Sequence, residues 1–197
     1  MEIVIASKNK GKIGEIINYA VWPDIKWLTY EDVNEFPDVE ESGNSFLDNA
    51  IIKAKALYNS TKKTVFADDS GLIVDALEGR PGIYSSRYAR PNATDKENRD
   101  KLLDEIKNIK DPHKRSARFV CSIVLWDADI GLIFKTEGVC EGMIGFEERG
   151  RGGFGYDCIF TPEGYNKTLA ELKRSDKNKI SHRGIALSEF YHFIVKR

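Results

Sequence analysis

Residues 65–74 have the sequence VFADDSGLIV, in which an apolar stretch leads into two acids, a serine and a glycine before a second apolar stretch. Val65–Ala67 and Leu72–Val74 are strand-like, so an acidic corner is expected between them. Asp, Ser and Gly all favour turns, which gives the corner a purely structural interpretation. Asp68 and Asp69 also repel each other and resist burial unless a cation lies beside them, which favours a Mg²⁺ site. This segment alone leaves both interpretations open.

The bulk composition indicates a globular protein with one domain over residues 1–197. Its residues are 41% hydrophobic and 31% charged, and no linker divides them. The net charge of −1 gives no overall field that attracts nucleic acid or an anionic membrane, so phosphate binding requires local positive clusters. The start, Met1–Ala6, is apolar over too few residues for a signal peptide, and the run Val120–Trp126 is too short to span a bilayer.

Three cysteines, Cys121, Cys140 and Cys158, are spread over the second half of the chain. Their number is odd and no two form a CxxC pair, which argues against a disulfide framework or a zinc site. We expect reduced thiols in the core, and this favours a cytoplasmic location.

Hydrophobic spacing predicts a mixed α/β fold with a substantial strand content. The expected elements, in chain order, are a strand over 2–6, a helix over 13–21, a strand within 25–40, a helix over 47–58 capped by Ser42, Asn44 or Ser45, strands over 65–67 and 72–74, a helix opened by the capping box 94–97, strands over 117–126 and 130–144 joined by a tight turn, a short strand over 158–160, and a final helix after Ser181.

The polar loop after the first strand is a candidate phosphate site. A helix N-terminus directs free N–H groups and a partial positive charge outward, and three lysines reinforce it. The GxxxxGK[ST] spacing of a Walker A loop is absent, and a solvated, charged helix start remains the alternative. The loop consists of Ser7, Lys8, Asn9, Lys10, Gly11 and Lys12.

A second acidic patch, Asp38–Gly43, precedes the second helix. Acids there would stabilise the helix N-terminus without any other role. In the functional interpretation, Glu40 or Glu41 reaches the two acids of the first motif at one Mg²⁺ ion, and Lys53 faces the same pocket.

The glycine-rich run Gly150–Asp157 permits close backbone approach to a ligand. Phe154 and Tyr156 are a candidate stacking platform for a base, and Asp157 a candidate acceptor for a base edge or sugar. The alternative is a turn whose aromatic side chains pack in the core.

A polar segment over 177–183 begins the last predicted helix and contains Lys177, His182 and Arg183. Taken alone, it is an ordinary helix cap on the surface. A Ser-His-Asp hydrolase is rejected, because the chain has three histidines and no GxSxG elbow.

Six motifs in fixed order closely resemble the inosine triphosphate pyrophosphatase family, whose members act on non-standard purine nucleoside triphosphates. Each motif alone is weak, but the ordered set is specific and covers nearly the whole chain. The motifs are SxNxxK at 7–12, EESG at 40–43, ADDSGL at 67–72, PGIYSSRYA at 81–89, GGFGYD at 152–157 and ISHRG at 180–184.

The resemblance implies an α/β fold with an elongated mixed β-sheet flanked by helices, two lobes with the active-site cleft between them, and a homodimer. It implies Mg²⁺-dependent hydrolysis of ITP, dITP or XTP to the monophosphate and pyrophosphate, with a small-molecule nucleotide as partner. Two alternatives remain open, a related pyrophosphatase for modified pyrimidine nucleotides and a nucleotide-binding protein without turnover.

The resemblance also implies residue roles. Asp69 is the expected catalytic base and a metal ligand with Glu40, while Glu41 and Asp68 remain alternative ligands. We expect Phe154 to stack on the base, and donors such as Lys177 and Arg183 to read its 6-oxo group. The expected substrate-binding residues are Ser7, Lys8, Asn9, Lys10, Gly11, Lys12, Lys53, Ser70, Phe154, Gly155, Tyr156, Asp157, Lys177, His182 and Arg183.

Two positions depart from the family pattern. Cys158 replaces a frequent proline beyond the expected pocket residues, and Arg151 replaces a small residue, which would alter entry to the cleft.

Overall fold

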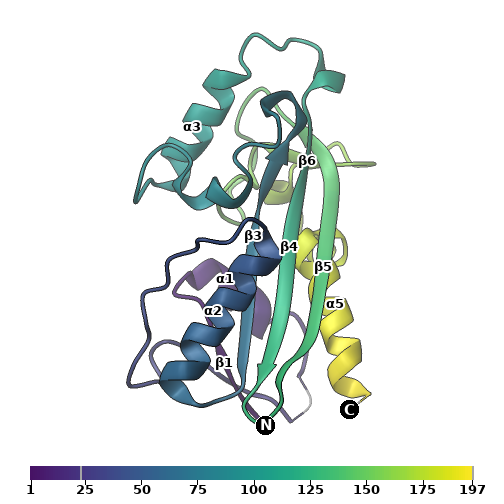
Figure 1. The fold of residues 1–197 in the computed structure, drawn as a ribbon. Coiled ribbons are helices and arrows are strands. Elements are labelled where there is room, and N and C mark those ends of the chain that lie inside the picture. Colours follow the sequence, from purple (N-terminus) through teal and green to yellow (C-terminus); the bar gives the residue numbers. More distant parts are fainter. Residues whose placement is uncertain (23, 197) are drawn as a thin grey trace. The chain divides into compact units, whose positions relative to one another are not determined.

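A computed structural model describes residues 1–22 and 24–196. Helices flank a six-stranded sheet in the order β2-β1-β3-β4-β5-β6 (Figure 1). Strand β1 is parallel to β2 and β3, whereas β5 and β6 are antiparallel, so the predicted mixed α/β sheet is confirmed. The strands are β1 (Glu2–Ile5), β2 (Lys26–Leu28), β3 (Val65–Val74), β4 (Ser116–Asp127), β5 (Gly131–Ile144) and β6 (Phe160–Pro162). The α-helices are α1 (Lys10–Ile17), α2 (Phe46–Thr61), α3 (Asp95–Glu105), α4 (Arg174–Ile180) and α5 (His182–Val195).

The chain divides into two compact units. Unit 1 consists of Met1–Asp69, Cys121–Gly138 and Arg183–Arg197, and unit 2 of Ser70–Val120 and Val139–His182. Strands β3, β4 and β5 therefore each contribute residues to both units. The single domain over 1–197 and the cleft expected from the resemblance stay predictions.

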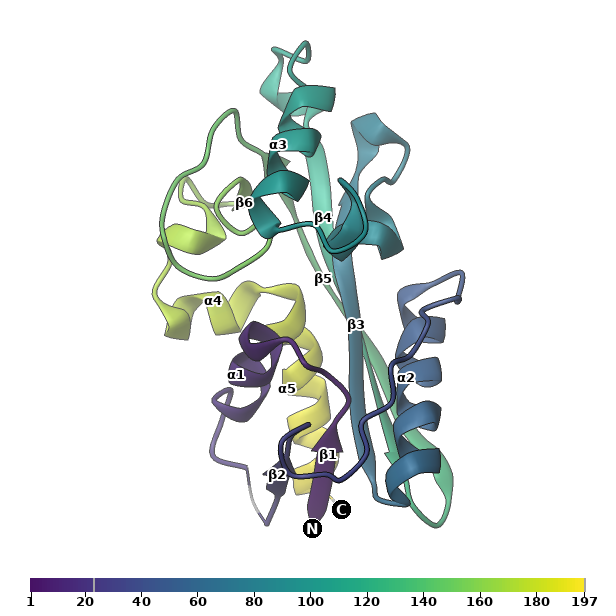
Figure 2. The ribbon, with the colours of Figure 1, turned by 90° about the vertical axis from the view of Figure 1, so that its left-hand side faces the viewer.

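Unit 1 has helices on both faces of its part of the sheet. Figure 2 shows α1 and α5 on one side of β1 and β3, and α2 on the other. Ile3, Ile5 and Phe66 pack with residues of α1 and α5, whereas Val4 and Val65 pack with residues of α2. Since side chains alternate along a strand, each residue of β3 in this unit is assigned to one helix layer or the other.

Strand β3 differs from the prediction. It is one continuous strand over Val65–Val74, not two strands separated by an acidic turn. Its two acids are buried at 1% and 5% exposure, which an extended backbone tolerates because cationic side chains lie beside both. Turn propensity at Asp68–Gly71 is therefore overridden by tertiary ion pairs that a local pattern does not reveal.

The first two helices are confirmed, with one shifted boundary. Helix α1 begins at Lys10, earlier than predicted, because the Asn9 side chain caps it by accepting from the backbone N–H of Lys12 at 3.1 Å. Helix α2 follows Ser45, which accepts from the N–H of Asp48 and is thus the cap among the three candidates.

The C-terminal part contains an unpredicted helix. Helix α4 precedes Ser181, and α5 follows it as predicted. Lys177 therefore lies on α4, not at the start of the last helix. Strand β6 begins at Phe160, two residues later than expected.

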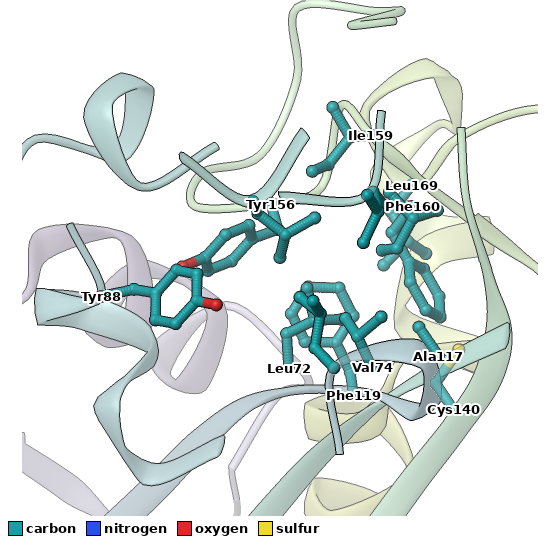
Figure 3. Packing of buried hydrophobic residues seen from close by; sticks show 14 residues of the cluster. Leu72, Val74, Tyr88, Ala117, Phe119, Cys140, Tyr156, Ile159, Phe160 and Leu169 are labelled. Atoms are coloured by element: carbon teal, nitrogen blue, oxygen red, sulfur yellow. The ribbon is translucent and has the colours of Figure 1, made fainter. Parts of the chain in front are cut away.

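Unit 2 has its own hydrophobic core, shown in Figure 3. Leu72 and Val74 of β3 pack there with Phe119 and Phe160, whose rings lie 4.8 Å apart. The predicted capping box of α3 is present, with Thr94 and Glu97 bonded reciprocally.

The cysteines are free thiols, as predicted. Cys121 and Cys140 are buried and Cys158 is half-buried. In the described part of the chain, no helix has the length and apolar character needed to span a membrane.

Candidate active site

Asp68 lies on the face of β3 that packs against α1 and α5. Its carboxylate is 1% exposed, and its Oδ2 is 3.2 Å from Lys12 Nζ and 3.0 Å from Arg183 Nη2. Burial raises the pKa of Asp68, but the charges of Lys12 and Arg183 outweigh burial and hold it well below its usual range. Asp68 is therefore a buried anion fixed between two cations.

Arg183, the first residue of the last segment of unit 1, is 2% exposed. Its Nη1 lies 2.5 Å from Glu15 Oε2, and its Nε and Nη2 donate to Asp68. Burial lowers the pKa of Arg183, yet the two carboxylates raise it overall, so the guanidinium stays charged. The residue expected to read a base is thus held in a buried ion-pair cluster that connects α5 to α1.

Glu15 was not predicted as part of the site. It lies on α1 within a run whose apolar residues pack on α5, and its side chain is mostly buried. A glutamate between Gly14 and Ile16, on the part of α1 that also carries Ile13 and Ile17, was the only signal. This signal does not identify a partner 168 residues away.

Asp69 lies on the opposite face of β3, towards α2. Its Oδ1 is 2.9 Å from Lys53 Nζ, and its Oδ2 accepts from Asn49 Nδ2 at 3.3 Å. Lys53 also lies 3.1 Å from Glu41 Oε1. Burial lowers the pKa of Lys53, but the neighbouring carboxylates raise it overall, so the ammonium remains charged.

The structure thus brings Asp69, Lys53 and Glu41 together. Glu40 is exposed, and Glu41 is the member of the acidic patch that shares a cation with Asp69. This arrangement favours Glu41 over Glu40 as the second carboxylate. It does not fit the interpretation in which Asp68 joins the same ion, since adjacent strand residues point to opposite faces.

Asn49 is a further residue that the sequence reasoning missed. It is fully buried and connects Asp69 to the acidic patch, because its Oδ1 accepts from the N–H of Gly43 at 2.9 Å. A Cβ built on Gly43 would lie 2.8 Å from that same Oδ1, so the close approach requires glycine. The signal was present in α2, where Phe46, Asn49, Lys53 and Leu57 follow helical spacing and place two polar residues on an apolar face.

The opening loop presents its lysines in different settings. Lys8 is exposed and pairs with Asp38 at 2.7 Å, with its ammonium 5.3 Å from the Phe36 ring centre. Lys12 turns inward to Asp68, while Lys10 stays exposed in the first turn of α1. The backbone conformation of the loop is fixed by Ser7 Oγ, which accepts from Asn9 N at 3.1 Å, and Gly11 lies within that first turn.

Unit 2 carries a second polar group centred on Asp157, which is 4% exposed. Its Oδ2 accepts from Phe154 N at 2.9 Å and from Lys177 Nζ at 2.8 Å. Lys177 Nζ lies 5.6 Å from the Phe154 ring centre. Gly153 has φ +71°, and a Cβ there would lie 2.0 Å from Asp157 Oδ2, so the loop can close around this carboxylate only with glycine.

The other aromatic of the glycine-rich loop has a core position. Tyr156 is buried in the core of unit 2, and its hydroxyl donates to Ser85 O at 2.8 Å. The alternative interpretation, a core aromatic, therefore describes Tyr156 better than a stacking platform does. Gly155 ties the loop to α3, since its N–H donates to Asp95 Oδ2 and its carbonyl accepts from Arg99.

His182 and Ser70 complete the set of predicted residues in unit 2. The His182 ring stacks on Phe119, with centroids 4.6 Å apart and planes 10° from parallel. Ser70 follows Asp69 in β3 and is half-buried.

The carboxylates around Lys53 are the candidate ligands for a metal ion. Among residues 1–22 and 24–196, no group of three or more His, Cys, Asp or Glu side chains is arranged to hold a metal ion. Asp69 and Glu41 instead form a pair of carboxylates that converge on one cation, the Lys53 ammonium. Mg²⁺ is commonly held by one or two carboxylates together with substrate phosphates, so this pair fits Mg²⁺ better than a metal that needs an all-protein cage.

Comparisons with known proteins agree over nearly the whole chain. Residues 3–193 match the sequence profile of the Ham1 family. The dITP/XTP pyrophosphatase of Oceanobacillus iheyensis is 43% identical over 95% of both chains, and that of Halalkalibacterium halodurans is 46% identical over 95% of this chain and 96% of its own. Solved structures of a HAM1 protein from Coxiella burnetii and of the Staphylococcus aureus Ham1 protein align with TM-scores of 0.89 and 0.87, each at 41% identity. The first alignment covers 100% of both chains, and the second covers 100% of this chain and 99% of the other. The chain therefore belongs to the Ham1 family.

Proposed function

We propose that this protein hydrolyses the non-standard purine nucleoside triphosphates ITP, dITP and XTP to the monophosphate and pyrophosphate. The observation that carries the proposal is the buried Asp69, held by Lys53 and Asn49 with Glu41 on the same lysine. The curated relatives named dITP/XTP pyrophosphatase support the substrate class, because they match over nearly their full length.

The triphosphate is assigned to the lysines of unit 1. Lys8, Lys10 and Lys12 belong to one short segment, and Lys53 lies beside Asp69. Lys8 and Lys10 are exposed, and the Asp38 partner of Lys8 is exposed as well. An incoming phosphate can therefore replace Asp38 on Lys8 with little desolvation. When bound, Mg²⁺ supplies charge neutralisation and orients the phosphates, with Asp69 and Glu41 as its protein ligands and Glu40 as the alternative.

Asp69 is assigned to the chemical step. Its carboxylate orients or deprotonates the water that attacks the α-phosphorus, and pyrophosphate leaves. Asn49 holds one carboxylate oxygen, which limits rotation of the side chain. The lysine charges stabilise the negative charge that develops on the leaving pyrophosphate.

The purine base is assigned to Phe154, which stacks on it, and to N–H groups that donate hydrogen bonds to a 6-oxo group and disfavour the 6-amino group of adenine. Lys177 is oriented by Asp157, and Arg183 by Asp68 and Glu15. Donors held in this way lose little entropy on binding, which favours selectivity.

We further propose Mg²⁺ as cofactor, a homodimer, a cytoplasmic location, and no nucleic-acid or membrane partner. The net charge of −1 supports the last point, since nucleic-acid binding depends on clustered positive charge.

The test is pyrophosphate release, with Mg²⁺, from ITP, dITP and XTP beside ATP, GTP, CTP and UTP. Strong release from the deaminated purines alone would support the proposal. A preference for pyrimidine nucleotides would contradict the proposed substrate, and orthophosphate as product would contradict the proposed bond cleavage. Binding without turnover would contradict catalysis itself.

A further inference from the structure

Two carboxylates of unit 1 converge on a single ammonium group. Lys53 Nζ lies 2.9 Å from Asp69 Oδ1 and 3.1 Å from Glu41 Oε1. The Lys53 side chain is only 12% exposed, so solvent screens these contacts poorly. The ammonium therefore occupies the space where both carboxylates direct their oxygens.

A divalent cation bound by the same two oxygens would lie within a few ångströms of Lys53. Two positive charges at that separation repel strongly in a partly buried site. Lys53 must then leave Asp69 and Glu41 before a metal ion can bind them. Asn49 keeps its hydrogen bond to the other oxygen of Asp69, so the exchange requires movement of the lysine but not of the carboxylate.

A polyphosphate would supply both the anion that Lys53 needs when it leaves Asp69 and Glu41 and the further oxygen ligands that the metal needs. Its oxygens offer Lys53 a new anionic partner and give the metal the ligands that two carboxylates alone do not provide. No third His, Cys, Asp or Glu joins the pair within the described residues.

We infer that Lys53 acts as a tethered counter-ion that excludes divalent metal from Asp69 and Glu41 until a nucleoside polyphosphate draws it away. This inference rests on the proposed function and deepens it, since it makes metal loading dependent on substrate. The nucleotide-free protein would then carry no tightly bound metal, even at millimolar Mg²⁺.

The test measures Mn²⁺ binding to the nucleotide-free protein, by loss of the paramagnetic resonance signal of free Mn²⁺. Lys53→Met removes the competing charge, so we expect at least about tenfold tighter Mn²⁺ binding than in the unaltered protein. Lys55→Met is the matched control, because it removes an exposed lysine of the same helix and should leave the affinity unchanged. Equal affinities of the Lys53→Met variant and the unaltered protein would overturn the inference.

Three further variants guard against misfolding. Lys53→Gln also removes the charge and should tighten Mn²⁺ binding, whereas Lys53→Arg retains it and should not. Adding Glu41→Gln to Lys53→Met should abolish the gain. Mn²⁺ should raise the melting temperature of the Lys53→Met and Lys53→Gln variants more than that of the unaltered protein, because binding to the folded state stabilises it.

The outcome is independent of turnover. If no nucleotide is hydrolysed but the charge-removing variants gain Mn²⁺ affinity, the proposed function fails and the role of Lys53 stands. If deaminated purines are hydrolysed but Mn²⁺ affinity is the same in every variant, the proposed function stands and this inference fails.

Discussion

Asp68 and Asp69 are consecutive residues of one strand, yet they bind different cations on opposite faces of the sheet. Asp68 is paired with Lys12 and Arg183, whereas Asp69 is paired with Lys53 and bonded to Asn49. Adjacent acids in a sequence motif therefore need not form one site. The two carboxylates have separate partners, so the structural role expected of Asp68 and the chemical role proposed for Asp69 can be tested separately.

Replacing Asp69 with Asn should abolish most turnover while preserving the fold. Asn keeps the shape and one acceptor but cannot take a proton, so we expect kcat to fall at least about 100-fold, the size of a general-base contribution. Steady-state kinetics of pyrophosphate release, with a thermal melt as the folding control, measures this. Near-normal turnover in a folded variant would remove Asp69 from the role.

Replacing Asp68 with Asn should chiefly cost stability. The change leaves the buried Arg183 without its main partner, and breaking such a pair costs about 3–5 kcal/mol at neutral pH. Because the folded pKa of Asp68 lies below its ordinary value, the stabilisation is complete above the unfolded pKa of about 3.9 and declines as pH falls towards the folded value. Urea unfolding at pH 7 and pH 3 should show a smaller difference between the two proteins at the lower pH. A constant difference would show that the carboxylate charge is not its source.

Two glycines of the same loop form a matched pair. Gly153→Ala and Gly155→Ala both place alanine at positive φ, +71° and +60°. Each variant should therefore lose about 1–2 kcal/mol of folding free energy to backbone strain. Only at Gly153 does the added Cβ collide with Asp157, whereas nothing lies within 4 Å at Gly155. We expect a larger fall in melting temperature and a higher KM for Gly153→Ala, because Asp157 orients Lys177 and Phe154. Equal losses in the two variants would contradict this.

Thiol labelling should distinguish the three cysteines. Burial raises the pKa of Cys121 to about 12 and that of Cys140 to about 11, so neither forms thiolate at pH 8. Burial raises the pKa of Cys158 as well, but this thiol is half-buried and should be the first to react with iodoacetamide. Mass spectrometry of the native protein should find the label on Cys158 alone, and denaturation should expose the other two. Fast labelling of Cys121 would contradict its buried position.

Local patterns were enough to predict most of the elements. The apolar spacing of α2, the capping box of α3 and the tight connection between β4 and β5 all depend on neighbours in sequence, and each is confirmed. Strand β3 was interpreted as two strands because its polar centre is compatible with a strand only when distant cations neutralise it. Helix α4 was missed, since its charged sequence lacks an apolar repeat.

The candidate site likewise combines residues that local motifs reveal with contacts that only the folded chain creates. Sequence motifs named Asp69 and Lys53 as candidates, but they favoured Glu40 as the second carboxylate and left Glu41 as the alternative. That choice depends on which side chain reaches Lys53 across 12 residues, and Asn49 enters the site through a bond to Asp69 across 20 residues. Such relationships arise only when the helix and the strand pack.

The two units alternate along the chain, which limits how the gene can be divided. Unit 1 is assembled from three separate stretches and unit 2 from two, so no single cut in the chain separates one complete unit from the other. A gene fragment ending anywhere between residues 70 and 182 would lack the closing stretch of unit 1. A crossover at a single point in the gene therefore cannot transfer one complete unit without part of the other.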